Sequence, residues 1–343
     1  MFKIDSKSAL NIKVIGVGGA GGNIVTLAVK DNFPDIEFIN INTDSQALRT
    51  SIAPSKIELG TYTTRGEGTG GDLDTAKRAC EEQKEEIVQA LEGAHLVFIT
   101  AGMGGGTGTG AAPVVSEIAH RLGIMTIAVV VLPFSFEGKR KRMKAMRGKE
   151  ELKSKVDTLI SIENDKLFTN FIGNIPLTES FEKANYVLVE LIESLSLMLI
   201  IPGIVNMDMA AFRKVIKGGK EVILGIGEGE GENRVLSAVE GAVNSPWLEK
   251  NSFKKLKRAL ICVMGGEDLN LKETSQVVEM INHRIHPDAH ITFGAVTLPR
   301  YNDKLKVIVV GDTTAVESME EFEETTVPPT RKSEGGGPLL WKE

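Results

Sequence analysis

Apolar and polar residues follow one another along the first half of this chain in blocks that are typical of strands followed by helices. The apolar runs are short and rich in β-branched residues, and the segments between them carry charges at helical spacing. The strand-like runs are 12–17, 36–41, 95–103 and 124–134, and the helix-like segments are 23–30, 73–92 and 113–123. This alternation predicts a doubly wound, mainly parallel α/β sheet of the Rossmann-like type.

Residues 178–201 form a longer segment that is apolar on almost every side. Its charged residues, among them Glu190 and Glu193, and the Pro202-Gly203 that follows argue against a membrane span. A helix that is apolar all round is normally buried between layers of a protein. We therefore expect a long central helix that joins two parts of the chain.

The second half predicts a smaller α/β domain. Strand-like runs begin at Arg258, His290 and Lys304, with helical patterns at 233–244 and 271–285. The sequence then becomes acidic and rich in Gly and Pro, which is typical of a flexible tail. The predicted division is 1–177 for a nucleotide-binding domain, 178–203 for the central helix, 204–315 for the C-terminal domain and 316–343 for the tail.

Composition excludes several classes of protein. The 343 residues are 42% hydrophobic and 25% charged, as in a globular protein, and the net charge of -6 argues against a nucleic-acid partner. The two cysteines, Cys80 and Cys262, form neither a disulfide framework nor a thiolate metal site. The N-terminus lacks a signal peptide, and no run of about 18 apolar residues is present. We expect a soluble, cytoplasmic protein without direct membrane insertion.

Glycine clusters follow the predicted strands. The first cluster, residues 16–22, contains GxGxxG between a strand and a helix, where the backbone can approach a phosphate and the helix N-terminus favours an anion. This motif alone is weak evidence. It also fits an NAD-dependent oxidoreductase, with Asp44 as the acidic residue after the second strand, or a purely structural turn.

A second cluster, residues 102–110, favours a nucleoside triphosphate. It has six glycines and two threonines in nine residues, and such a loop makes an anion-binding nest. No GK[ST] follows, so it is not a Walker A loop. A third segment, 64–72, adds glycines that could close over a terminal phosphate.

These loops resemble those of the tubulin/FtsZ superfamily of polymerising GTPases. The resemblance rests on GMGGGTGTGAAP from Gly102, supported by VIGVGGAGGN, TRGEGTGGD, PFSFEGK and ENDKLF in family order over about residues 11–315. It is closer to the FtsZ branch than to eukaryotic tubulin. The resemblance implies a GTP-binding cytoskeletal protein that polymerises head to tail for cell division, with GTP or GDP and Mg2+ as ligands.

The resemblance also implies roles for individual residues around the nucleotide. The α and β phosphates would be held by Gly18, Gly19, Ala20, Gly21, Gly22 and Asn23, and the phosphate chain would be wrapped by Gly104, Gly105, Gly106, Thr107, Gly108 and Thr109. Thr69 and Gly70 would face the γ-phosphate, Glu137 the ribose, and Asn164, Phe181 and Asn185 the guanine. Lys141 stands where the family has an arginine. The remaining residues implied in the site are Asn42, Asp44, Gly71, Gly102 and Pro133.

The family's catalytic loop follows the central helix and enters the nucleotide pocket of the next subunit. Here the loop contains Asn206 and Asp208, but Ala211 replaces the family's final aspartate. A methyl group cannot orient water, so we expect strongly impaired hydrolysis, with Asp208 as a source of residual activity or as a simple helix cap. Ala211 is either native to a slow enzyme or, as we favour, an engineered replacement. A non-hydrolysing structural or regulatory filament protein is the other alternative.

Three further features carry weaker interpretations. His283, His286 and His290 lie close together but lack a fourth ligand, so no metal site is predicted. The basic run that begins at Lys139 is interpreted as a solvated helix face. The terminal 338–343 segment is an apolar cluster on a flexible linker, and the resemblance implies a membrane-tethering partner for it at the division site.

Overall fold

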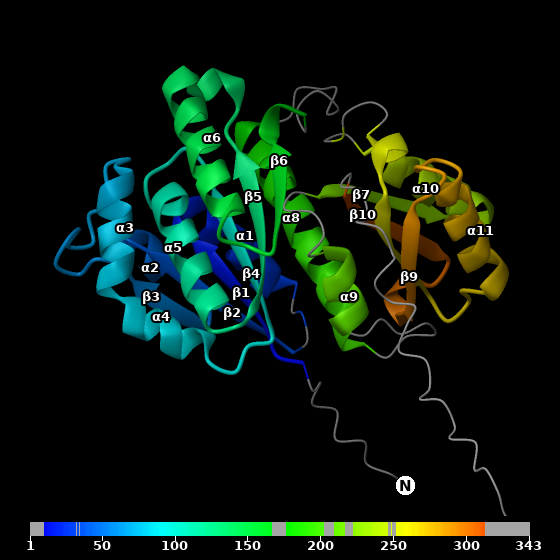
Figure 1. Cartoon of the computed structure of the whole chain (residues 1–343), viewed down its shortest axis with the longest axis horizontal. Coiled ribbons are helices and arrows are strands. Elements are labelled where there is room, and N and C mark those ends of the chain that lie inside the picture. The colour runs from blue at the N-terminus through cyan, green and yellow to red at the C-terminus, as the bar shows by residue number, and fades with distance from the viewer. Residues whose placement is uncertain are drawn as a thin grey trace, which may run out of the picture.

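The computed structural model contains two sheets on either side of one long helix (Figure 1). It describes residues 10–31, 33, 35–166, 176–201, 209–216, 222–245, 248 and 252–312. In the described part of the chain, no helix is long and apolar enough to cross a bilayer.

The larger sheet has six parallel strands in the order β3-β2-β1-β4-β5-β6. Its strands are β1 (Ile12–Val17), β2 (Ile36–Asn42), β3 (Ser55–Glu58), β4 (Leu96–Gly102), β5 (Met125–Leu132) and β6 (Thr158–Glu163). The strand order reverses between β1 and β4, and ligands of such sheets bind at the carboxyl ends of strands at this point. The doubly wound fold expected from the sequence is confirmed.

Helices cover both faces of this sheet. The helices of this half are α1 (Gly18–Lys30), α2 (Ser45–Thr50), α3 (Leu73–Glu82), α4 (Lys84–Leu91), α5 (Thr107–Arg121), η1 (Ser135–Glu137) and α6 (Lys139–Lys153). One face packs on α3 to α6 in a core of aliphatic side chains, and the other packs on α1 and on the long helix α8 (Leu177–Ile200). The single helix expected at 73–92 is wrong, because the chain breaks at Gln83 into α3 and α4.

The smaller sheet has four strands in the order β7-β10-β8-β9, in which β10 is antiparallel to both neighbours and β8 is parallel to β9. Helix α9 (Met209–Ile216) precedes this sheet in the chain. The other elements of this half are β7 (Ile223–Glu230), η2 (Gly231–Asn233), α10 (Arg234–Val243), η3 (Phe253–Lys255), β8 (Arg258–Gly265), α11 (Leu271–Asn282), β9 (His290–Thr297), η4 (Pro299–Tyr301) and β10 (Lys304–Asp312). Helices α10 and α11 cover the face turned away from α8.

The position of α8 explains its sequence. Buried side chains of α8, such as Leu188 and Ile192, belong to one continuous core with Val14 of the large sheet and Ile308 of the small sheet. A helix that packs on a sheet from each side needs apolar residues on most of its surface. Its charged residues serve the same contact, because Glu190 pairs with the buried Lys306 of β10.

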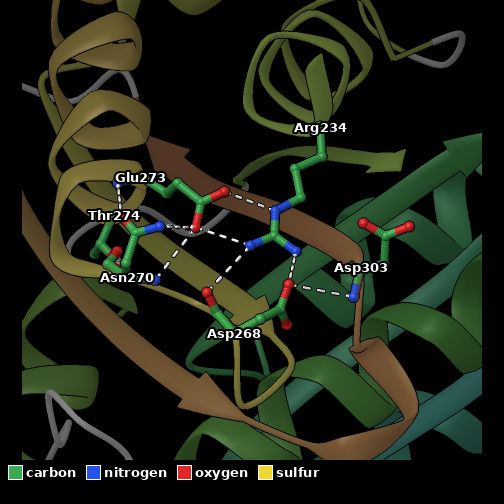
Figure 2. A network of polar contacts seen from close by, with 6 residues as sticks. All are labelled: Arg234, Asp268, Asn270, Glu273, Thr274 and Asp303. Carbon is green, nitrogen blue, oxygen red and sulfur yellow. Dashed lines mark hydrogen bonds and ion pairs between the residues drawn. The ribbon is translucent and has the colours of Figure 1, made fainter. Parts of the chain in front are cut away.

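A buried arginine at the start of α10 joins the loop after β8 to the first turn of α11 (Figure 2). Arg234, with a side chain only 7% exposed, donates from Nε and Nη2 to the two carboxylate oxygens of Glu273 at 2.7 and 2.9 Å. Its Nη1 pairs with Asp268, whose carboxylate also accepts from the backbone N–H of Asp303. Glu273 in turn completes a capping box with Asn270 at the start of α11. The arginine thus fixes both helices of this sheet to its connecting loops.

Candidate functional site

A pocket of about 390 Å³ lies at the carboxyl ends of β1, β4 and β5, where the strand order of the large sheet reverses. Most of the residues that the sequence singled out line it. These are Gly19, Ala20, Asn23, Gly102, Gly105, Gly106, Thr107, Gly108, Pro133, Glu137, Lys141, Asn164, Phe181 and Asn185. The pocket therefore joins the first two glycine loops to the start of α8.

The glycines bring the two loops into direct contact. Gly18 has a positive φ of 72°, and a Cβ there would lie 2.9 Å from the backbone nitrogen of Gly108. A Cβ on Gly108 would lie 2.6 Å from the carbonyl oxygen of Gly102, and one on Gly102 would lie 2.6 Å from the Cβ of Ala20. Any side chain would thus separate the loops. The result is a cradle of backbone N–H groups at the first turns of α1 and α5, which suits phosphate.

The third loop is seated on the second. A Cβ on Gly106 would collide with the hydroxyl of Thr69 and lie 3.0 Å from the Cα of Gly71. The hydroxyls of Thr43 and Thr107 are 2.7 Å apart and tie the end of β2 to α5. Thr69, Gly70 and Gly71 do not line the pocket themselves. Thr69 and Gly71 instead lie against Gly106, and we call the edge of the pocket formed by Gly106 its rim.

Asn164 and Phe181, which also line the pocket, have side chains suited to recognising a ligand. Asn164 is 5% exposed, and its buried Oδ1 accepts no hydrogen bond from the described residues. Phe181 lies edge-on to Phe134 with ring centroids 5.3 Å apart, and Phe134 stacks on Phe136 at 4.9 Å. An unpaired acceptor beside an aromatic ring suits a flat base with N–H donors.

The acidic and basic residues of this region neutralise one another in part. Glu137 accepts from the backbone N–H of Phe134 at 2.9 Å and pairs with Lys141 one turn later. Arg142 pairs with Glu163 and Asp165. Burial alone would raise the pKa of the Glu163 carboxyl, but the positive charges of Lys166 and Arg142 lower it below its ordinary value. The pocket lining thus contains a positively charged side chain, Lys141, whose ammonium is held by the carboxylate of Glu137.

Several predicted residues lie away from the pocket lining. Asp44 caps α2, where its carboxylate accepts from the backbone N–H groups of Gln46 and Ala47 at 2.9 and 3.1 Å. Asn42 is buried and accepts from the N–H of Asp44. Gly18, Gly21, Gly22, Gly104 and Thr109 support the loops from behind, and Asn206 and Asp208 lie outside the described residues.

The pocket also has an apolar part that the sequence did not indicate. Val17, Met103, Val131 and Leu132 line it. All four lie at the ends of buried strands or directly after them. In the sequence they are indistinguishable from the core residues beside them, and only the meeting of the three strand ends exposes them to the pocket.

Comparison with known proteins identifies the chain. The GTPase domain of the Tubulin/FtsZ family matches residues 11–171, and the C-terminal domain of the FtsZ family matches residues 220–315. A point mutant of FtsZ from M. jannaschii is 41% identical over 88% of this chain and 90% of its own, with a TM-score of 0.82. The chain belongs to the FtsZ family. The NAD-dependent oxidoreductase alternative is therefore wrong, since this family consists of GTP-binding GTPases.

Other solved structures agree with this assignment. An empty FtsZ dimer from M. jannaschii is 39% identical, covers 94% of this chain and 95% of its own, and has a TM-score of 0.83. The GTPγS-bound protofilament of CetZ2 from Haloferax volcanii is 20% identical over 88% of this chain and 92% of its own, with a TM-score of 0.75. At that identity CetZ2 shows the shared fold. The FtsZ relationship expected from the glycine loops is confirmed.

Proposed function

We propose that the chain binds GTP in the pocket and assembles head to tail into protofilaments, in which each contact between subunits completes a hydrolytic site. The glycine cradle would hold the phosphates, Lys141 and Glu137 the ribose side, and Asn164, Phe181 and Asn185 the guanine. The buried, unpaired Oδ1 of Asn164 fits a base that offers N–H donors, as guanine does. Bound Mg2+, held by phosphate oxygens and water, would neutralise charge on the phosphates.

The distance between the pocket and the end of α8 carries this proposal. Helix α8 lines the pocket with Phe181 and Asn185 and continues to Ile200. At about 1.5 Å per residue, the end of the helix lies roughly 22 Å from Asn185. The chain therefore leaves α8, toward Asn206 and Asp208 in the sequence, at this distance from its own pocket.

The position of α9 agrees with this distance between the pocket and the end of α8. The hydroxyl of Thr158, at the start of β6, donates to the carbonyl of Ile216 at the end of α9 (2.6 Å), whereas Asn164 follows the opposite end of β6 and lines the pocket. Eight residues, 201–208, separate α8 from α9 in the sequence, and the end of each helix lies away from the pocket. We propose that Asn206 and Asp208 therefore act in the pocket of a neighbouring subunit.

A contact of this kind does not close on itself. The pocket is at one edge of the large sheet and the end of α9 is at the opposite edge. If the residues before α9 contact the pocket of the next subunit, each subunit presents a different surface to each neighbour, and such contacts generate filaments. The FtsZ dimer and the CetZ2 protofilament among the similar structures assemble with copies of themselves. Their assembly supports the same behaviour for this chain.

Ala211 is the reason to expect slow hydrolysis. It lies in the first turn of α9, where the family's pattern has an aspartate. We propose that its methyl group cannot orient the attacking water and that turnover falls about 100-fold or more. The same substitution supports the alternative of a stable, non-hydrolysing filament.

Phosphate release separates these possibilities. It is measured with GTP and Mg2+ above the concentration at which pelleting detects polymer, for this chain, for Ala211→Asp and for the control Ala210→Asp. We expect slow release from the chain and the control and fast release from Ala211→Asp. Equal rates from all three would show that Ala211 is not the lesion, and release from unassembled chains would refute the shared site.

We propose a role in cell division, which membership of the FtsZ family supports. We propose the domain division of 1–177, 178–203 and 204–315, with the tail as a tether to a membrane-anchored partner at the division site. The 338–343 segment lies outside the described residues. Deletion of residues 335–343 should leave polymerisation intact and abolish binding to the membrane-anchored partner. Unchanged binding to that partner would contradict the proposed role of the tail as a tether.

A further inference from the structure

One face of α6 packs along the phosphate loops. Lys141 lines the pocket, and a Cβ on Gly104 would lie 2.9 Å from its side chain. Gly148, two turns further, packs so tightly that a Cβ there would collide with Thr109. Residues three and four positions apart share a helix face, so Lys144 lies between these two contacts. The basic run of α6 is therefore more than a solvated surface at this residue.

Lys144 reaches the third glycine loop. Its ammonium donates a hydrogen bond to the carbonyl of Gly71, and a Cβ on Gly71 would lie 3.4 Å from Nζ. Gly71 has a positive φ of 85° and lies against Gly106, which lines the pocket. The hydroxyl of Thr69 lies against the same glycine. Lys144 thus fastens the Thr69 to Gly71 segment onto the rim of the pocket.

The charge of Lys144 is balanced less than that of its neighbour. Lys141 forms an ion pair with Glu137, whereas Lys144 forms none with any described carboxylate. The nearby Asp72 caps α3 through the backbone N–H of Thr75 at 2.8 Å. Hydrogen bonds from Thr75 are the main cause of the lowered pKa of Asp72, and the charge of Lys144 is only a secondary cause. An ammonium has three donors, and a carbonyl partner takes one of them without neutralising the charge. A positive charge consequently remains beside the rim.

We infer that Lys144 is a positioning residue that makes the pocket prefer a nucleoside triphosphate to a diphosphate. It holds the Thr69 to Gly71 segment against Gly106, which lines the pocket, and in the proposed site it would place a positive charge near a third phosphate at Gly106. A diphosphate ends before the rim and gains from neither. This inference rests on the proposed GTP site and adds to it the residue that distinguishes the two nucleotides.

The test measures the affinity of the full chain for fluorescent GTP and GDP analogues separately. Lys144→Met should weaken GTP binding about tenfold, the loss of one charge-assisted contact, and change GDP binding less than about twofold. Lys144→Arg should retain most of the preference because it keeps the charge. Lys139→Met is the matched control, since Lys139 is an exposed lysine of the same helix that does not line the pocket.

Each outcome decides the inference. An equal loss of both nucleotides in Lys144→Met, or the same loss of preference in Lys139→Met, would overturn it and leave the GTP site standing. Failure of the unaltered chain to bind either nucleotide would overturn the proposed function instead. Circular dichroism verifies that the variants are folded, and Lys144→Gln replaces Lys144→Met if the latter is not.

Discussion

Replacing Arg234 by methionine should cost about 3–5 kcal/mol of the free energy of unfolding of the smaller sheet. The guanidinium is 7% exposed and makes two hydrogen bonds to the carboxylate of Glu273, which is itself 16% exposed. Hydrogen bonds to charged groups contribute about 1.5–3 kcal/mol each, and removing one partner of a buried ion pair costs about 3–5 kcal/mol. The contact with Asp268 adds little to this sum, because that carboxylate is largely exposed.

The chain contains a matched control for this variant. Arg284, just after α11, pairs with Glu240 of α10, so it links the same two helices with the same chemistry. Both side chains of this pair are 39% exposed, and exposed pairs contribute about 0–1 kcal/mol. Arg284→Met should therefore be nearly neutral. Arg234→Lys keeps the charge but not the paired hydrogen bonds, so its loss should be intermediate.

Urea unfolding followed by tryptophan fluorescence measures these differences. Trp341→Phe leaves Trp247, which lies between α10 and β8 in the sequence, as the only tryptophan. Hydrogen bonds from Arg234 lower the pKa of Glu273 below 4.5, so this stabilisation is present at neutral pH and is lost as the pH falls below about 4.5. Equal losses in Arg234→Met and Arg284→Met, or a difference that persists unchanged at low pH, would refute the reasoning.

Two further substitutions probe the contacts of β7 and β10. Lys306→Met should destabilise the chain by about 3–5 kcal/mol in thermal melts, because the side chain is 3% exposed and pairs with Glu190 of α8; the exposed Lys304→Met should cost less than about 1 kcal/mol. Although burial alone lowers the pKa of Lys306, Glu190 raises it above 10.5, so the pair should persist at pH 10. Gly227→Val should abolish the near-ultraviolet circular dichroism of the native chain, because a side chain there collides with the backbone of α10, whereas the exposed Glu230→Val should not.

The sequence predicts those strands that contain enough apolar residues to indicate a buried strand. The apolar runs at β1, β4 and β5 are buried along nearly their whole length, so they appear as continuous hydrophobic stretches. The strand β7 was missed because glycines alternate along it. A Cβ on Gly225, Gly227 or Gly229 would collide with the backbone of α10, so packing against the helix removed the side chains that would have indicated a strand.

The break between α3 and α4 has a tertiary cause that local patterns do not contain. The side chain of Gln83 accepts from the backbone N–H of Gly60 and donates to the hydroxyl of Thr61. Glu82 accepts from the N–H of Tyr62 in the same turn. These contacts belong to residues about 20 positions away, and they end a helix whose charge pattern continues through the break.

The candidate site shows the same division between local and distant information. Glycine loops can be read from the sequence because backbone approach demands glycine itself, and the pocket brings two of these loops together. The supporting residues depend on what packs behind the loops. Thr43 meets Thr107, and Lys144 meets Gly71, across 64 and 73 positions of sequence. Neither pair has a pattern that would identify it before the fold is known.

In the proposed mechanism, the length of α8 would separate nucleotide binding from hydrolysis. The helix lines the pocket at Asn185 and ends about 22 Å away, before the loop that leads to Ala211. Ala211 lies in α9, the end of which contacts the start of β6 at the sheet edge opposite the pocket, so a substitution there should not disturb the glycine cradle or Asn164. On this proposal, the chain could keep the glycine loops of the nucleotide pocket while it lacks one acidic group of the catalytic loop. The proposed mechanism also requires that Ala211→Asp alter turnover in the polymer while leaving the nucleotide affinity of the single subunit unchanged.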